Sequence, residues 1–260
     1  EKWKCVILVD EYDKPLSDNV FTGEAEGMRN VIRCFFEVIR AMAECLRFVF
    51  ITGVTRYAKV SIFSSMNNLF DISMDESYSS MFGYTQKELE ANFADMIEAG
   101  LARTSLSKND YLDRFKVKYD GYRFAIDSEK VYNPVSVGMF FAKGGKDFDS
   151  FWADTGGNAK LVVDAAKRAN FNIVADLKCP VTKSLVSSYD IIEMTGSDIS
   201  PDLVNSLLYQ SGYLTMGESL PGGQAFKLVF PNECDSWNIR QRSLRDRFRP
   251  QGAFLSHGLL

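Results

Sequence analysis

Histidine is almost absent from this chain, which has one, His257, in 260 residues. Acid–base catalysis or metal binding that depends on histidine is therefore nearly excluded. Cysteine is also sparse and shows no pattern. The five cysteines are odd in number and widely spaced, and no pair forms a C-x-x-C motif. Neither a disulfide framework nor a zinc site is predicted, and this usage is typical of the reducing cytoplasm, where we expect the protein to be.

Long apolar runs are missing as well. No stretch approaches the roughly 20 apolar residues that cross a bilayer, and no signal peptide is recognisable, so no membrane partner is expected. The net charge of −4 provides no general attraction to nucleic acid.

The most informative segment present is a run of β-forming residues, 6–9, that ends in two adjacent carboxylates, Asp10 and Glu11. Such a run predicts a strand of a parallel sheet that is buried on both faces. Ligand sites of open α/β sheets lie at the carboxyl ends of the strands. Asp10 there could hold the Mg²⁺ of a bound nucleotide through water, and Glu11 could polarise the water that attacks the terminal phosphate, which is the Walker B pattern. The alternative is a buried strand whose two acids only open a polar turn.

The phosphate-binding loop that accompanies Walker B is missing. That loop needs G-x-x-x-x-G-K-[ST], because backbone N–H groups, a lysine and a hydroxyl surround the phosphates together. The chain's one Gly-Lys pair, Gly145-Lys146, is followed by Asp147 and has Phe140 in the first glycine position. We expect the loop to lie upstream of Glu1, so that this chain is a fragment of a larger protein.

A second polar strand end is predicted close to the first. Apolar residues recur at spacings of three and four over residues 24–46, which indicates an amphipathic helix, and residues 48–51 form a second buried strand. Strand, helix and strand make a βαβ unit with parallel strands. Thr52 ends the second strand, where P-loop ATPases place a residue that senses the γ-phosphate, and Arg56 could reach the same phosphates. A glycine turn with an exposed arginine is the alternative.

The following segments are less regular. Residues 70–74 are predicted to form a third strand, and Thr85 opens a capping box before a helix. Ser136 is predicted to cap the helix that runs through Phe141. Further on, Ser200 and Pro201 start a helix that Gly212 ends, and a hairpin follows around residues 221–223. A helix followed by a hairpin is typical of a winged helix. The arginine-rich residues after 234 could bind nucleic acid, or else they are a disordered or out-of-frame end.

Several segments together resemble a bacterial family of predicted AAA-ATPase-like proteins, close to the signal-transducing STAND ATPases. The resemblance covers about residues 4–233 and rests on residues 9–16, 52–56 with 61–64, 66–69, 82–85 with 88–89, 119–122 with 132–134, and 208–214. It implies ATP and Mg²⁺ as ligands, Asp10 as the Mg²⁺ residue, Glu11 as the catalytic base, and Thr52 and Arg56 at the γ-phosphate. Many members continue into a PD-(D/E)XK nuclease-like domain, which is a possible partner in the parent chain.

The predicted fold class is α/β: a partial P-loop NTPase (RecA/AAA-like) parallel sheet core, then a helical lid and a winged-helix-like module. The corresponding ranges are 1–74 for the core, 75–195 for the lid and linker, 196–233 for the winged-helix-like module and 234–260 for the basic tail. The predicted function is ATP binding and hydrolysis in the full-length protein. The alternative is a non-catalytic regulatory or protein-interaction module, serving a nuclease-like domain outside this chain.

Overall fold

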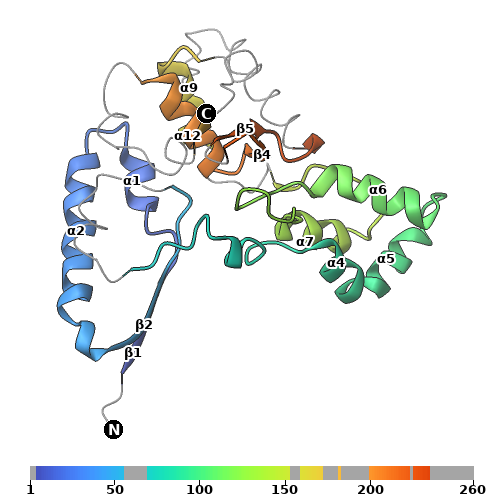
Figure 1. Ribbon diagram of the computed structural model, residues 1–260, viewed down its shortest axis with the longest axis horizontal. Coiled ribbons are helices and arrows are strands. Elements are labelled where there is room, and N and C mark those ends of the chain that lie inside the picture. Colours follow the sequence, from blue (N-terminus) through green and yellow to red (C-terminus); the bar gives the residue numbers. More distant parts are fainter. Residues whose placement is uncertain are drawn as a thin grey trace, which may run out of the picture.

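The protein is a mixed α/β chain whose described elements form two lobes (Figure 1). The structure, a computed structural model, describes residues 4–55, 69–152, 159–171, 181–182, 199–222 and 225–234. One lobe combines the N-terminal strands and helices with elements from residues 159–230, which share one apolar core. The other lobe is built from the middle of the chain around a second core.

The N-terminal lobe begins with a strand–helix–strand unit. The strand β1 (Cys5–Val9) is followed by the short helix α1 (Lys14–Asn19), the long helix α2 (Ala25–Ala41), the 3₁₀ turn η1 (Ala43–Cys45) and the strand β2 (Leu46–Ile51). The two strands pair in parallel, with Val6 opposite Phe48 and Val9 opposite Ile51. The predicted parallel pairing is therefore confirmed.

Helix α2 covers one face of this small sheet. Its apolar residues Ile32, Phe36 and Ile39 are buried and join the same core as Ile7 and Val49 of the strands. The apolar spacing of three and four places these side chains on one side of the helix, and this burial is what stabilises the unit.

The opposite face of the sheet is open to solvent. Val6, Leu8 and Phe48 are exposed, Leu8 to 70%. The rings of Phe48 and Phe50 stack on this face at a centroid distance of 6.1 Å. The prediction that the first strand is buried on both faces is therefore wrong, because the described elements pack against one face only.

Residues 70–74, predicted as a third strand, are irregular instead, with a turn at residues 73–74. The Asp71 carboxylate accepts a hydrogen bond from the Ser73 backbone N–H at 3.1 Å, and Phe70 is exposed. This local hydrogen bond favours a turn over a strand. Within the described residues, the parallel sheet has only β1 and β2.

The second lobe is helical and rich in aromatic side chains. After the 3₁₀ turn η2 (Glu76–Tyr78) come α4 (Gln86–Asn92), α5 (Ala94–Leu101), α6 (Lys108–Tyr119) and α7 (Pro134–Ala142). The predicted capping box of Thr85 and Glu88 is confirmed. The cap of α7 is Asn133, whose side chain accepts from the Ser136 N–H at 3.0 Å, so the predicted Ser136 cap is wrong.

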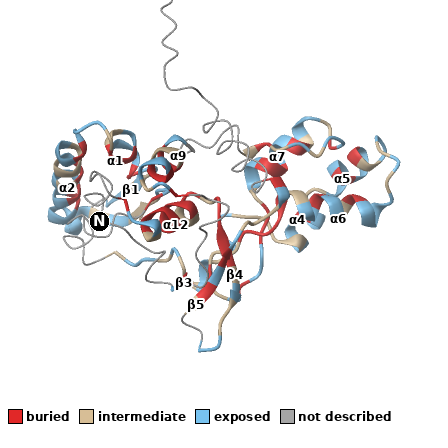
Figure 2. Ribbon diagram, turned by 90° about the horizontal axis from the view of Figure 1, so that it is seen from above, coloured by how far each residue is buried: buried red, intermediate tan, exposed pale blue. Residues whose placement is uncertain are grey.

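The last elements return to the first lobe. They are the helix α9 (Ala159–Arg168), the short strand β3 (Val181–Thr182), the helix α12 (Pro201–Gln210) and the strands β4 (Thr215–Ser219) and β5 (Ala225–Val229). The strands form an antiparallel sheet in the order β3-β5-β4. As predicted, Ser200 caps α12, and Gly212 follows it with a positive φ of 78°. Buried residues are concentrated in α12, β4 and β5 (Figure 2).

A tight turn after α6 connects the helical lobe to this antiparallel sheet. Gly121 has a φ of 112°, and a Cβ atom there would lie 1.8 Å from the carbonyl oxygen of Pro231. The Arg123 guanidinium donates to the carbonyl oxygen of Gly217 at 2.9 Å. Only glycine at position 121 permits the close approach of the Gly121 and Pro231 backbones. In the part of the chain that the structure describes, none of the helices has the length and apolar character to cross a bilayer.

Candidate nucleotide site at the ends of β1 and β2

The carboxyl ends of β1 and β2 bring two predicted site residues into contact. The Thr52 hydroxyl donates to the Asp10 carboxylate at 2.5 Å. The backbone continues the pairing of the strands through this point, because the Thr52 N–H donates to the Val9 carbonyl at 2.8 Å and the Tyr12 N–H to the Thr52 carbonyl at 3.0 Å. Parallel pairing thus places Asp10 and Thr52 at one edge of the sheet, as the sequence predicted.

Glu11 follows directly at this edge with an unusual backbone. It is exposed and has a φ of 51°, in the left-handed region that residues other than glycine rarely adopt. Its N–H donates to the Asp10 carboxylate at 3.0 Å, which helps to hold this conformation. Such a conformation costs about 1–3 kcal/mol and is found most often at functional sites.

Thr52 uses its only hydroxyl proton in the bond to Asp10. A hydroxyl has one donor and two acceptor positions. In this arrangement Thr52 therefore orients the Asp10 carboxylate, and donation to a phosphate would require the hydroxyl to rotate away from Asp10. The contact makes Thr52 a partner of the candidate metal-binding carboxylate as well as a candidate phosphate sensor.

The donor set at this edge fits Mg²⁺ bound together with a nucleotide. Mg²⁺ keeps most of its water and takes one or two protein carboxylates plus phosphate oxygens, so a complete protein cage is not required. Asp10 is an exposed carboxylate of this kind. Among the described residues, no group of three or more His, Cys, Asp or Glu side chains could hold a metal ion alone, and Asp10 with Glu11 would contribute only part of the coordination.

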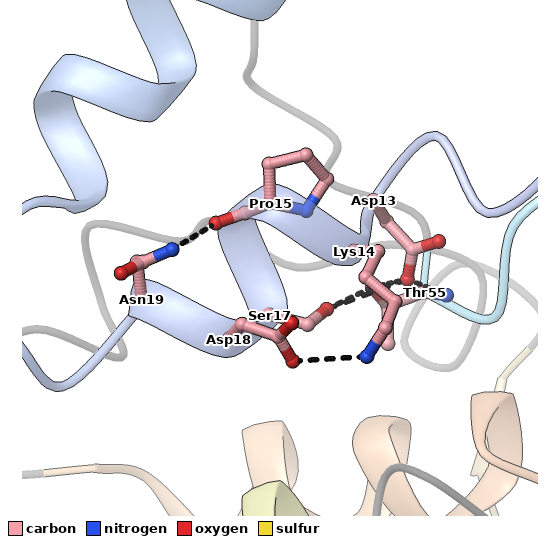
Figure 3. Close-up of polar contacts among 7 residues, drawn as sticks. All are labelled: Asp13, Lys14, Pro15, Ser17, Asp18, Asn19 and Thr55. Atoms are coloured by element: carbon pink, nitrogen blue, oxygen red, sulfur yellow. Dashed lines mark hydrogen bonds and ion pairs between the residues drawn. The ribbon is translucent and has the colours of Figure 1, made fainter.

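Sequence reasoning missed a third carboxylate next to this site. Asp13 is buried, with 2% of its surface exposed, and accepts hydrogen bonds from the Val54 N–H at 3.1 Å and the Thr55 N–H at 2.8 Å. The Thr55 hydroxyl also donates to Asp13, at 2.5 Å (Figure 3). The signal in the sequence was an acid three residues after Asp10 together with a second threonine three residues after Thr52. Arg56, the remaining predicted site residue, lies outside the described residues.

A known protein family matches the segment that contains this candidate site. Residues 1–63 match the family described as Predicted AAA-ATPase. This AAA-ATPase-like segment contains β1, α1, α2 and β2, and therefore Asp10, Glu11, Asp13 and Thr52.

A longer similarity links the chain to a bacterial protein. It is 34% identical over 232 residues to the "Uncharacterized protein in vnfD 5'region" of Azotobacter chroococcum mcd 1. The alignment covers 88% of this chain and 40% of that protein, so the chain spans less than half of its relative's length. No solved structure matches the chain.

Proposed function

We propose that this chain supplies the Walker B and sensor residues of an ATP-hydrolysing P-loop domain in the full-length protein. The observation that carries the proposal is the contact between the Thr52 hydroxyl and the Asp10 carboxylate at the shared edge of two parallel strands. The family match over residues 1–63 supports it independently. The phosphate loop is absent from these 260 residues, and the proposal requires another part of the full-length protein to contribute it.

In this proposal each residue has a separate role. Asp10 would hold Mg²⁺ through a water molecule. Thr52 keeps the Asp10 carboxylate oriented and, once its hydroxyl rotates away from Asp10, would donate to the γ-phosphate. Glu11 accepts a proton from the attacking water, and Arg56 stabilises charge on the transferring phosphoryl group. Mg²⁺, when bound with ATP, neutralises negative charge on the phosphates.

The rest of the chain is assigned to accessory modules of the same protein. We propose a helical lid and linker over residues 75–195, a winged-helix-like module over 196–233 and a basic tail over 234–260. Helix α12 followed by the hairpin of β4 and β5 supports the winged-helix assignment. A STAND-type signalling role in the cytoplasm and a PD-(D/E)XK nuclease-like partner domain belong to this proposal as well.

A second function is favoured by the open face of the parallel sheet. Exposed apolar side chains such as Leu8 and Phe48 are typical of a surface that contacts another protein. The chain would then be a non-catalytic interaction module whose acids are only strand-end residues. The upstream coding sequence discriminates the two functions: an in-frame G-x-x-x-x-G-K-[ST] supports the ATPase, and an in-frame stop codon supports the module.

Substitution of Glu11 in the full-length protein tests the ATPase directly. Glu11→Gln keeps the shape of the side chain but removes the charge that activates water. We expect ATP hydrolysis to fall at least about a hundredfold with nearly unchanged ATP affinity. Asp10→Asn should instead weaken Mg²⁺-dependent binding. Glu44→Gln, at an exposed position in η1, is the matched control and should leave both quantities unchanged.

Steady-state phosphate release and ATP titration measure the two effects. Unchanged turnover in Glu11→Gln would show that hydrolysis uses another base, and the role assigned to Glu11 would be wrong.

A further inference from the structure

The buried carboxylate of Asp13 joins the turn after β1 to the loop after β2. Its two oxygens accept the N–H groups of Val54 and Thr55 and the Thr55 hydroxyl. The Ser17 hydroxyl adds a longer bond of 3.4 Å, and the Tyr12 hydroxyl donates to the Thr55 carbonyl at 2.9 Å. Thr55 is thus held through its N–H, its side chain and its carbonyl by residues of the other strand end.

Capping of helix α1, the usual role of an aspartate at this position, does not explain the contacts of Asp13 with the loop after β2. Asp13 is the N-cap residue of α1, and aspartate at this position usually accepts a hydrogen bond from the first turn of its helix. In this protein its side chain makes no capping hydrogen bond. Figure 3 shows the carboxylate directed at Thr55, whereas the Lys14–Asp18 pair of α1 lies to the side.

Gly53 allows the two loops to come this close. A Cβ atom at Gly53 would lie 2.5 Å from the Tyr12 ring and 2.6 Å from the Asp13 carboxylate. The segment from Thr52 to Thr55 is therefore fixed at both ends: Thr52 by the β1–β2 pairing and its bond to Asp10, and Thr55 by Asp13.

We propose that Asp13 is a positioning residue that locks the loop after β2 and thereby holds the Thr52 hydroxyl against Asp10. Asp13 does not touch a ligand in this arrangement, because its carboxylate is buried and its bonds are directed to the loop. Its effect on catalysis rests on the proposed ATPase function, but its effect on the loop does not.

Residue-resolved hydrogen exchange of the 260-residue chain tests the lock without any activity. In Asp13→Asn, one oxygen is replaced by an NH₂ group that cannot accept, so at least one of the Val54 and Thr55 amides loses its acceptor and should exchange about ten- to a hundredfold faster. The amides of the β1–β2 ladder should change by less than about threefold. Asp18→Asn, an exposed acid on α1, is the control and should leave Val54 and Thr55 unaffected.

Two milder variants keep the test decisive if Asp13→Asn does not fold. Thr55→Val removes only the hydroxyl and should accelerate exchange in the loop, whereas Thr55→Ser retains the hydroxyl and should not. Equal acceleration along the whole ladder and the loop would overturn the proposal, because Asp13 would then support only global stability. Unchanged exchange in the loop would overturn it too.

Gly53→Ala provides an independent steric test of the same lock. The added methyl group would displace Tyr12 and Asp13, so exchange at Thr55 should accelerate as in Asp13→Asn. Gly27→Ala is the matched control, since its Cβ would meet no atom closer than 4.0 Å. Protection at Thr55 that survives Gly53→Ala would contradict the lock.

Kinetics of the full-length protein then link the lock to turnover. Thr55→Val should lower kcat at least about tenfold while KM for ATP stays within about threefold, and Thr55→Ser should retain most of the activity. A raised KM with unchanged kcat would overturn the catalytic part of the proposal. If exchange confirms the lock but the unmodified protein hydrolyses no ATP, the ATPase function fails and the positioning of the loop stands.

Discussion

Three carboxylates within residues 10–13 have different surroundings and therefore different chemical capacities. Asp10 is exposed and bound to Thr52, Glu11 is exposed on a left-handed backbone, and Asp13 is buried among donors. A buried carboxylate is stable only when several donors satisfy it, which is the case for Asp13. Exposed carboxylates remain available to water, a metal ion or a substrate. In the proposed function, Asp10 and Glu11 therefore contact the ligand, and Asp13 holds the loop in place.

Asp120 is a second buried carboxylate, but it is less well satisfied. Within the described residues, its Oδ1 atom has no hydrogen-bond partner. Burial raises the pKa of the Asp120 carboxyl above its ordinary value of 3.8, and the Gly121 N–H and the charges of Lys116 and Lys130 only partly oppose this, while Glu129 adds to it. The folded state therefore binds a proton more readily than the unfolded chain does.

The raised pKa of Asp120 makes its contribution to stability depend on pH. Since the folded state binds more protons, the favourable contribution is present below the ordinary pKa and is lost as pH rises toward the raised one. Asp120→Asn removes the charge, so its urea midpoint relative to that of wild type should rise as the pH increases above the ordinary carboxyl pKa of 3.8. Asp113→Asn, on the exposed side of α6, is the control. A difference that does not vary with pH would contradict the assignment.

At the scale of elements, α2 has two apolar sides that differ in burial. Ile32, Phe36 and Ile39 are buried against the sheet, whereas Phe35 and Val38 are exposed. The neighbouring residues Phe35 and Phe36 contact each other edge to face, with ring centroids 5.3 Å apart. Their energetic contributions should nevertheless differ, because only Phe36 is removed from water by the core.

Phe35 and Phe36 are a matched pair for measuring this difference. Phe36→Ala should lower the free energy of unfolding by about 3–5 kcal/mol, through lost burial and a cavity. Phe35→Ala should cost less than about 1 kcal/mol, since its ring is half exposed. Urea denaturation of both variants measures the difference. Equal losses would mean that the exposed side of α2 is covered in solution, for example by a second copy of the chain.

The apolar periodicity of the sequence was sufficient to predict the N-terminal strands and helix α2, but not which elements pack against them. The parallel strands and α2 follow from local apolar patterns, and the contact of Asp10 with Thr52 follows from the geometry of parallel pairing. Whether one or both faces of β1 are buried could not be predicted correctly, because it depends on which elements pack there. The bond of Asp13 to Thr55 was missed because both residues lie beyond the ends of the strands, where parallel pairing does not determine which side chains meet.

Predictions of the α7 cap and of a third strand failed because two local sequence preferences competed at each place. Asn133 and Ser136 are both suitable N-cap residues. Proline favours the first helical position, so Pro134 makes the preceding residue, Asn133, the N-cap. Residues 70–74 have a strand-like composition, but Asp71 forms a turn with Ser73. In both cases one short hydrogen-bonded contact outweighed a propensity that is weak by itself.

At the scale of the molecule, the chain spans 40% of the length of its bacterial relative. Whether the chain alone binds a nucleotide depends on which phosphate-binding groups it contains. Phosphates are bound chiefly by backbone N–H groups of a glycine-rich loop and by its lysine. That loop does not occur anywhere in the 260 residues. The edge formed by Asp10 and Thr52 supplies a carboxylate, which can assist a metal ion but repels phosphates, and a hydroxyl whose proton is already donated to that carboxylate.

The isolated chain should therefore bind Mg-ATP no more tightly than about millimolar, because Walker B residues contribute little affinity without phosphate donors. Isothermal titration of the 260-residue chain measures this, and the full-length protein serves as the positive control. Micromolar binding by the chain alone would place the nucleotide elsewhere in the molecule.

The open face of the parallel sheet also has a practical consequence for recombinant work. β1 and β2 combine exposed side chains such as Leu8 and Phe48 with strand edges, a combination that templates intermolecular β-pairing. Self-association would then limit the soluble concentration of the isolated chain before thermal unfolding does. Charged substitutions at Leu8 and Phe48 would act as gatekeepers against aggregation without disturbing the core beneath α2.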